Sequence, residues 1–112
     1  MDIPRIIKKS LIENGMKLQL DIDHQLSAFE GHFDDAPIIP GVVQIQWVLA
    51  FNNQFLQEIS PLNIFRMDAL KFQQVIQPNS VVELVLERID NKLVFSFSSG
   101  SSKHSSGKIV VE

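Results

Sequence analysis

A single histidine stands in a stretch whose residue types suit acid/base chemistry. His32 lies between Gly31 and Phe33, and Pro37 and the pair Pro40-Gly41 follow it. Prolines restrict the backbone, so this loop would be rigid where it enters the apolar segment that comes next. Imidazole changes its charge close to neutral pH, which makes His32 a candidate general base.

The apolar segment predicts a helix, so the His32 imidazole would lie near a helix N-terminus. The first N–H groups of a helix have no partner within it, and the helix dipole is positive at that end. These groups suit a carbonyl oxygen that gains negative charge, such as that of a thioester. Removing the proton beside that carbonyl builds an enolate, so a base at carbon and donors at oxygen are complementary. The alternative is a loop histidine bonded to backbone groups.

Other polar stretches lack the spacing that a site requires. Ser99 to Lys108 is rich in hydroxyls, but Ser102 and Ile109 occupy positions where a phosphate-binding loop needs glycine and serine or threonine. We interpret this segment as a flexible hairpin loop. His24 and His104 have no second ligand at helical spacing, so we expect both to be exposed and predict no metal site.

Composition excludes several classes of function. The 112 residues contain no cysteine, which excludes disulfides and thiol catalysis, and the formal charge of −3 offers no basic surface for nucleic acid. The sequence shows neither a signal peptide nor a stretch that would span a membrane. We therefore expect one domain over residues 1–112, a cytoplasmic location, and no membrane or nucleic-acid partner.

The elements that would position these residues form an α+β pattern. Met16–Ile22 alternates apolar and polar residues as a half-buried strand does, and Asn14-Gly15 predicts a hairpin to a strand at Ile6–Ile12, although a short helix from Pro4 fits the same residues. Gly41–Gln57 carries no charge and is apolar nearly all round, which predicts a helix surrounded by protein. Further strands are predicted at Phe65–Gln74, Val81–Ile89, Leu93–Ser98 and Lys108–Val111. This order favours an antiparallel sheet around one buried helix.

The stretch from Gly31 to Trp47 resembles the signature of the FabA/FabZ-type β-hydroxyacyl-(acyl-carrier-protein) dehydratases, which have the hot-dog fold. The matching residues are Gly31-His32-Phe33 and the Pro-X-X-Pro-Gly-Val pattern of residues 37–42. Residues 43–47 are most similar to the aryl-polyene, ApeI-like members. Lys71-Phe72-Gln73 and Pro78-Asn79-Ser80 also resemble the family's strand and proline turn after the helix.

This resemblance implies that a 3-hydroxyacyl thioester, on acyl carrier protein or coenzyme A, loses water to give the trans-2-enoyl thioester without metal or organic cofactor. His32 matches the catalytic histidine, and Gly41 matches the glycine whose N–H faces the thioester carbonyl. Phe33 and Val42 stand in the matching signature as substrate-binding candidates. The family builds its site across a dimer interface, so we expect a homodimer or dimer-based oligomer with sheets paired edge to edge.

The chain departs from the family at Gln46, where the second catalytic group is a glutamate or aspartate. An amide has no proton to give at neutral pH, so Gln46 would either orient substrate or be an interface amide paired to backbone. His32 could shuttle one proton from carbon to the leaving hydroxyl, or Asp34 or Asp35 could act as the acid, although both aspartates also fit a solvated turn. The alternatives to an active dehydratase are a weak or inactive acyl-binding or assembly subunit and a hot-dog thioesterase.

Two further sets of residues have two interpretations each. Trp47, Phe51 and Phe55 recur at helical spacing and either line an acyl tunnel or form plain core. Arg66 and Lys71 either contact the phosphate of a carrier arm or are solvated strand residues.

Overall fold

The computed structural model describes residues 2–30 and 37–112, which form strands, one α-helix and short 3-10 turns. In chain order the elements are β1 (Arg5–Ile12), β2 (Gly15–Ile22), η1 (Ser27–Phe29), α1 (Gly41–Phe55), η2 (Pro61–Asn63), β3 (Ile64–Phe72), β4 (Ser80–Ile89), β5 (Lys92–Ser99) and β6 (Ser102–Val111). The predicted strand at residues 6–12 is confirmed and the alternative helix there is wrong, because β1 pairs with β2 through a hairpin. Within the described ranges, no helix is long and apolar enough to cross a bilayer.

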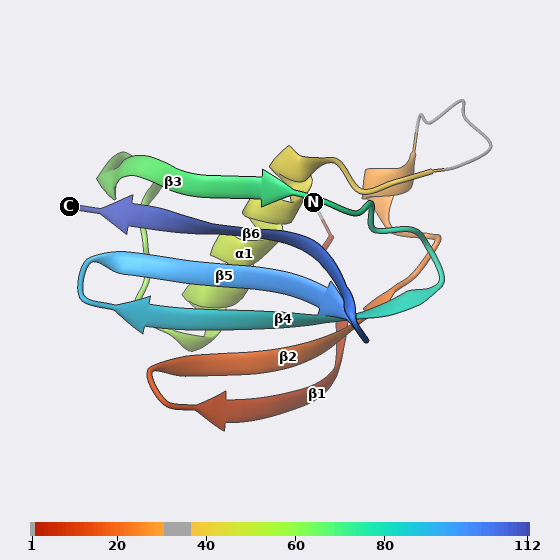
Figure 1. The fold of residues 1–112 in the computed structure, drawn as a ribbon, viewed down its shortest axis with the longest axis horizontal. Coiled ribbons are helices and arrows are strands. Elements are labelled where there is room, and N and C mark those ends of the chain that lie inside the picture. The colour runs from red at the N-terminus through yellow and green to blue at the C-terminus, as the bar shows by residue number, and fades with distance from the viewer. Residues whose placement is uncertain (1, 31–36) are drawn as a thin grey trace.

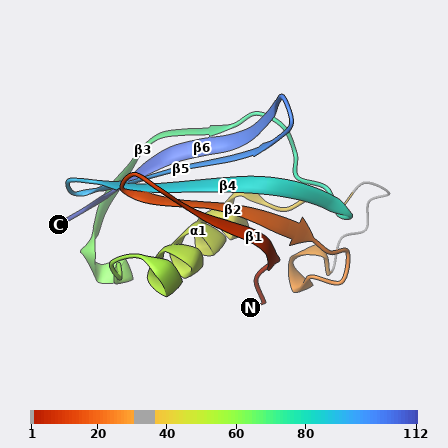
Figure 2. The same ribbon diagram turned by 90° about the horizontal axis from the view of Figure 1, so that it is seen from below.

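The strands form one six-stranded sheet in the order β1-β2-β4-β5-β6-β3, and every neighbouring pair is antiparallel (Figure 1). The helix α1 lies across one face of this sheet (Figure 2). This is the predicted α+β, hot-dog arrangement of an antiparallel sheet and a single helix. The prediction that protein surrounds the helix is wrong for this chain, because Val42, Gln46, Asn53 and Gln54 are exposed on the side away from the sheet. β1 and β3 are the two edges of the sheet, which leaves their outer backbone groups free to pair with another strand.

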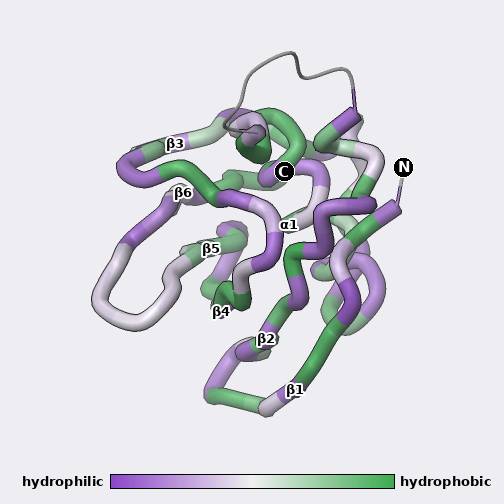
Figure 3. Tube along the Cα trace, turned by 90° about the vertical axis from the view of Figure 1, so that its right-hand side faces the viewer, coloured by the Kyte–Doolittle hydropathy of each residue, from purple (hydrophilic) through white to green (hydrophobic). Residues whose placement is uncertain are grey.

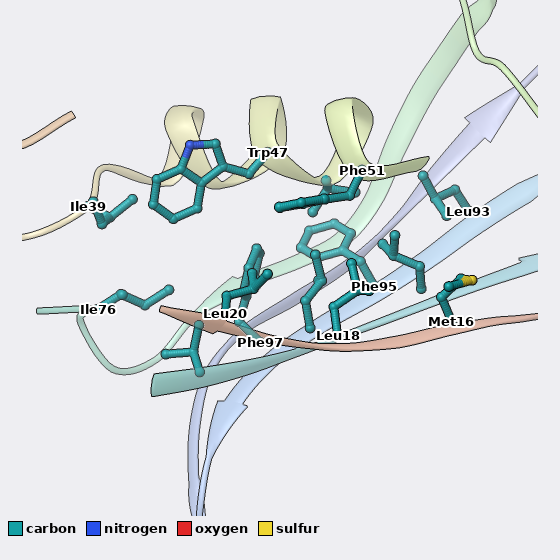
Figure 4. Packing of buried hydrophobic residues seen from close by; sticks show 14 of the residues in the cluster. Met16, Leu18, Leu20, Ile39, Trp47, Phe51, Ile76, Leu93, Phe95 and Phe97 are labelled. Atoms are coloured by element: carbon teal, nitrogen blue, oxygen red, sulfur yellow. The ribbon is translucent and has the colours of Figure 1, made fainter. Parts of the chain in front are cut away.

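The core lies between α1 and the sheet. Apolar and polar residues alternate along β2 (Figure 3), and its apolar side chains Met16, Leu18, Leu20 and Ile22 are buried. Leu18 and Leu20 face the aromatic rings of Trp47 and Phe51 on α1, with β5 contributing Phe95 and Phe97 (Figure 4). The period of two in the strand and the apolar face of the helix therefore meet in one cluster.

The helix ends at Phe55, two residues before the predicted boundary at Gln57. Leu56 leaves the helical conformation with an extended backbone, while its N–H still donates to the Asn52 carbonyl. The Asn52 side chain then donates to the Gln57 carbonyl at 3.0 Å. Because asparagine side chains compete well for backbone groups, they stop the helix before Ser60-Pro61 does.

The interpretation of the segment that begins at Ser99 as a flexible loop is wrong over most of its length. Gly100, with a φ of 57°, makes a tight turn, and β6 begins at Ser102. The small residues here reflect crowding between strands, since a Cβ at Gly107 would lie 2.5 Å from a Leu70 side-chain carbon. Low side-chain volume and hydroxyl content are thus features of a central strand rather than of a loop.

Candidate active site at the start of the helix

The N-terminus of α1 is open. Pro40 is the N-cap and contributes no side-chain cap, and its carbonyl accepts the amides of Val43 and Gln44, each at 3.1 Å. The amides of Gly41 and Val42 precede these bonds, so the helix offers them no acceptor. Together with the helix dipole, they make a site suited to an oxygen with partial negative charge.

A cavity of about 220 Å³ lies at this helix end. One wall is formed by the chain entering α1 and the other by the end of β3 and the segment after it; the lining residues are Ile38, Ile39, Pro40, Gly41, Gln44, Phe72, Gln73, Gln74 and Val75. A Cβ at Gly41 would lie 2.8 Å from carbons of the Phe72 ring, so a side chain there would force the ring to move. Glycine therefore lets the Phe72 ring pack closely against the first turn of the helix.

Hydrogen bonds fix the first wall. Ile39 donates its N–H to the Ile76 carbonyl at 3.0 Å, and its own carbonyl accepts from the Gln44 side chain at 3.1 Å. The Gln44 amide oxygen in turn accepts from the Ser105 hydroxyl at 2.6 Å. Both backbone polar groups of Ile39, the residue before Pro40, are thus hydrogen-bonded.

The second wall is held by His104, which is buried and not exposed as expected. Its carbonyl accepts the Gln73 amide at 2.9 Å, and its ring Nδ1 lies 3.2 Å from the Gln74 carbonyl. A carbonyl can only accept, so Nδ1 carries the proton and Nε2 accepts from the Ser99 hydroxyl at 2.7 Å. His104 is a structural histidine in this arrangement, whereas His24 is exposed as expected.

The structure separates the predicted site residues into three groups. Gly41, the predicted oxyanion donor, is among the residues that line the cavity. Val42, with 64% of its surface exposed, and Gln46, which is also exposed, lie on the outer side of α1 and are not among the cavity-lining residues. His32 and Phe33, like Asp34 and Asp35, lie outside the described residues.

Sequence reasoning missed Gln44 and Ser105. Gln44 precedes Trp47, Val48 and Phe51 by three, four and seven positions, so the helical period already placed it on the buried face. A polar residue on that face must find partners, which was a usable signal. Ser105 gave no comparable signal, because its partner is 61 residues away in the sequence.

The aromatic residues of α1 belong to the core rather than to a tunnel, as far as the described residues show. Trp47 and Phe51 are fully buried against the sheet (Figure 4), and Phe55 is a partly buried residue that packs against the same cluster. Arg66 pairs with Asp68 at 3.0 Å on the exposed surface of β3, and Lys71 is exposed. In residues 2–30 and 37–112, no three histidine, aspartate or glutamate side chains cluster as a metal site would need.

Outside the cavity, hydrogen bonds shift the pKa of the Asp2 carboxyl group. The Ser27 hydroxyl and the Ser27 backbone amide both donate to the Asp2 carboxylate. These bonds hold the pKa of Asp2 below its usual range. They tie the N-terminal segment to η1, the turn that ends three residues before His32 in the sequence.

The fold and the helix end define a hot-dog protein whose glycine-started helix faces a small cavity. A family model described as ApeI dehydratase matches residues 8–108, and the chain belongs to this ApeI-like dehydratase family. No curated protein sequence matches the chain.

Solved structures agree with this assignment. The dehydratase heterocomplex ApeI:P from Xenorhabdus doucetiae is 28% identical with a TM-score of 0.85, and the match covers 98% of each chain. An uncharacterized protein from Erwinia carotovora subsp. atroseptica is 28% identical with a TM-score of 0.76, covering 99% of this chain and 97% of that one. The dehydratase domain of the polyketide PpsC from Mycobacterium tuberculosis, 17% identical with a TM-score of 0.70, shares the fold over 100% of this chain and 45% of its own.

Proposed function

We propose that this protein removes water from a 3-hydroxyacyl thioester, carried by acyl carrier protein or coenzyme A, to give the trans-2-enoyl thioester. The observation that carries the proposal is the cavity at the uncapped start of α1, which Gly41 lines. We propose that the Gly41 amide donates to a thioester oxygen bound there. Membership of the ApeI-like dehydratase family supports the reaction class. The pathway would be fatty-acid or polyene-type biosynthesis in the cytoplasm.

In this mechanism His32 is the base. Its neutral imidazole takes a proton from C2 of the substrate, and the electrons of that C–H bond move toward the thioester carbonyl as an enolate. The Gly41 N–H donates to the enolate oxygen, which carries most of the new charge. The electrons then return to form the C2–C3 double bond, the C3–O bond breaks, and the hydroxyl leaves as water after it gains a proton.

The source of that last proton is the open part of the mechanism. Gln46 cannot supply it, because a neutral amide is not an acid at this pH. We propose that His32 returns the proton it took from C2, so that one group serves both steps and the net reaction needs no other acid. A carboxyl group of Asp34, Asp35 or a second chain is the alternative, and it would raise the rate if present.

A second chain would also complete the binding site. Small-molecule pockets commonly measure about 300–1,000 Å³, and the cavity at α1 is smaller than that range. The β3 edge next to it carries exposed apolar side chains: Phe65, Met67, Leu70, Phe72 and, just beyond the strand, Val75. We propose that β3 pairs edge to edge with β3 of a second copy or of a related chain.

Whether that second chain is identical is a separate question. This chain has no carboxylate at position 46 of its helix, so two identical copies would both lack it. The similar structure from Xenorhabdus doucetiae is a dehydratase heterocomplex, ApeI:P. We propose a homodimer as the basal state, with a related subunit that carries the acid as the alternative partner.

The dimer proposal is tested by Met67→Lys, which places a charge in the middle of the exposed β3 surface. Light scattering should show a dimer for wild type and a monomer for the variant. Lys8→Met, which removes a charge on the opposite edge strand β1, serves as the control and should stay dimeric. A monodisperse wild-type monomer would contradict the two-chain site.

A non-catalytic acyl-binding subunit is the second candidate function, and the exposed amide of Gln46 in place of an acid favours it. An assay with 3-hydroxyoctanoyl-coenzyme A distinguishes the dehydratase from the binding subunit, because only the dehydratase forms the enoyl product. Wild type should turn over slowly, and His32→Ala should abolish turnover. Binding of the thioester without any product would favour the binding subunit, and release of free thiol would indicate a thioesterase.

Gln46→Glu sharpens the same experiment. A positioned general acid contributes about 10²–10⁴-fold in rate, so this variant should raise turnover if Gln46 occupies the acid's place. Gln54→Glu adds the same charge on an exposed position of the same helix and should leave the rate unchanged. Equal rates for both variants would show that position 46 does not reach the reacting atoms.

A further inference from the structure

Two side chains behind the cavity form a buried hydrogen-bonded pair that sequence analysis did not assign. Gln44 is 3% exposed and Ser105 is 2% exposed, on α1 and β6 respectively. The Ile39 carbonyl can only accept, so the Gln44 nitrogen must face it and the Gln44 oxygen must face Ser105. The direction of all the hydrogen bonds in this pair is therefore determined by chemistry.

The pair connects β6, its neighbour β3 and the chain that enters α1. Ser105 is opposite Phe72 of β3 in the sheet, and Phe72 contacts Gly41. Gln44 joins this strand to the chain entering α1 through the Ile39 carbonyl. Only Pro40 lies between Ile39 and Gly41, and its ring restricts φ. A change in the position of the Ile39 carbonyl would therefore also move the Gly41 amide.

Stability alone does not explain why this polar pair is buried. An apolar side chain of similar size at position 44 would need no buried partners, and replacing both members of a buried polar pair is often close to neutral. The amide instead fixes geometry, because a buried hydrogen-bonded group has few alternative positions. It does so at the wall of the cavity that Gln44 itself lines.

We infer that Gln44 and Ser105 are positioning residues, which hold the Ile39–Gly41 backbone so that the Gly41 amide points into the cavity. The catalytic consequence rests on the proposed dehydratase function. The geometric consequence does not, because the Gly41 amide can be observed without any substrate. Neither residue touches the reacting atoms in this scheme.

The experiment compares Ser105→Ala, which removes the donor, with Ser105→Thr, which keeps a hydroxyl, and with Ser106→Ala, which removes the neighbouring hydroxyl. In ¹⁵N-labelled protein, Ser105→Ala should shift the amide resonances of Gly41 and Val42 and speed their hydrogen exchange. Ser105→Thr should restore the wild-type values, and Ser106→Ala should leave them unchanged.

The kinetic arm uses the same variants with 3-hydroxyoctanoyl-coenzyme A. A misplaced oxyanion donor affects the transition state more than the bound substrate, so Ser105→Ala should lower kcat about tenfold to a hundredfold while KM changes little. A purely structural role would lower only the unfolding temperature. Gln44→Leu is the second variant, and it should reproduce the shift of the Gly41 amide even if Ser105→Ala folds poorly.

The outcomes separate the two proposals. Unchanged Gly41 resonances and unchanged kcat in both Ser105→Ala and Gln44→Leu would overturn the inference. A wild-type protein that neither turns over nor binds the thioester would overturn the proposed function, and the resonances would still decide the positioning role.

Discussion

The two ends of α1 are built in opposite ways. At the C-terminus, the Asn53 side chain both accepts from the Ile59 amide and donates to the Ile59 carbonyl, at 2.8 and 3.1 Å. Arg88 adds a bond to the Gln57 carbonyl at 2.6 Å, beside the buried Asn52. At the N-terminus, Pro40 offers no side-chain cap and the first amides lie at a cavity.

This contrast indicates that the fold gives up stabilising hydrogen bonds at the N-terminus of α1. A side-chain cap at a helix N-terminus is worth about 1 kcal/mol, and nothing in the described chain supplies one to α1. The capped end satisfies polar groups that would otherwise be buried without partners. The uncapped end leaves the amides of Gly41 and Val42 without an acceptor inside the helix, and the proposed site would use this departure from local stability rules.

Gly41→Ala should produce the largest effect and is the sharpest test of the open end. Alanine keeps the amide N–H, but its Cβ would displace the Phe72 ring, which lines the same cavity. A ring moved into the path of the substrate would lower kcat by up to the ~10²–10³-fold cost of losing one oxyanion donor. Stability should not fall in parallel, because alanine favours a helix more than glycine does. Steady-state kinetics and urea unfolding measure the two quantities. Unchanged kcat would show that the packing of Phe72 on Gly41 does not affect the reaction.

Asn53→Ala, at the capped end, should lower the stability of the protein and leave kcat unchanged. Leaving buried backbone groups without partners costs about 1–3 kcal/mol, so the free energy of unfolding should drop by that order while kcat per folded molecule is maintained. Gln54→Ala changes the next, exposed residue and should stay within about 0.5 kcal/mol of wild type. A fall in kcat for folded Asn53→Ala would show that the two ends are coupled.

The smallest effect concerns Asp2, which binds Ser27 at the start of η1. Since the pKa of Asp2 is lowered in the folded protein, its stabilisation is complete above the unfolded value of 3.8 and is lost as pH falls through the folded value. The unfolding free energy of wild type relative to Asp2→Ala should therefore shrink as pH is lowered below 3.8. Ser27→Ala should give the same loss, and the double variant should lose no more. Additive losses would show that the two side chains act separately.

Local patterns predicted most of the elements because each pattern has a local cause. The alternation in β2, the Asn14-Gly15 turn and the Pro40-Gly41 start of the helix were all recognised from neighbouring residues. The prediction failed where distant partners decide. β6 was placed too late because its serines and glycine look like a loop until β5 and β3 pair with it on both sides.

The candidate site divides in the same way. Its glycine could be identified from the sequence, because Pro40-Gly41 before an uncharged apolar run determines how the chain enters the helix. What holds that entry in place could not, since Ser105 and His104 reach it from the far end of the chain. Sequence alone determined that a helix begins at Gly41. Tertiary structure decided which face of that helix is covered and which side chains hold the chain that enters it, because hydrogen bonds between distant strands depend on packing and not on sequence order.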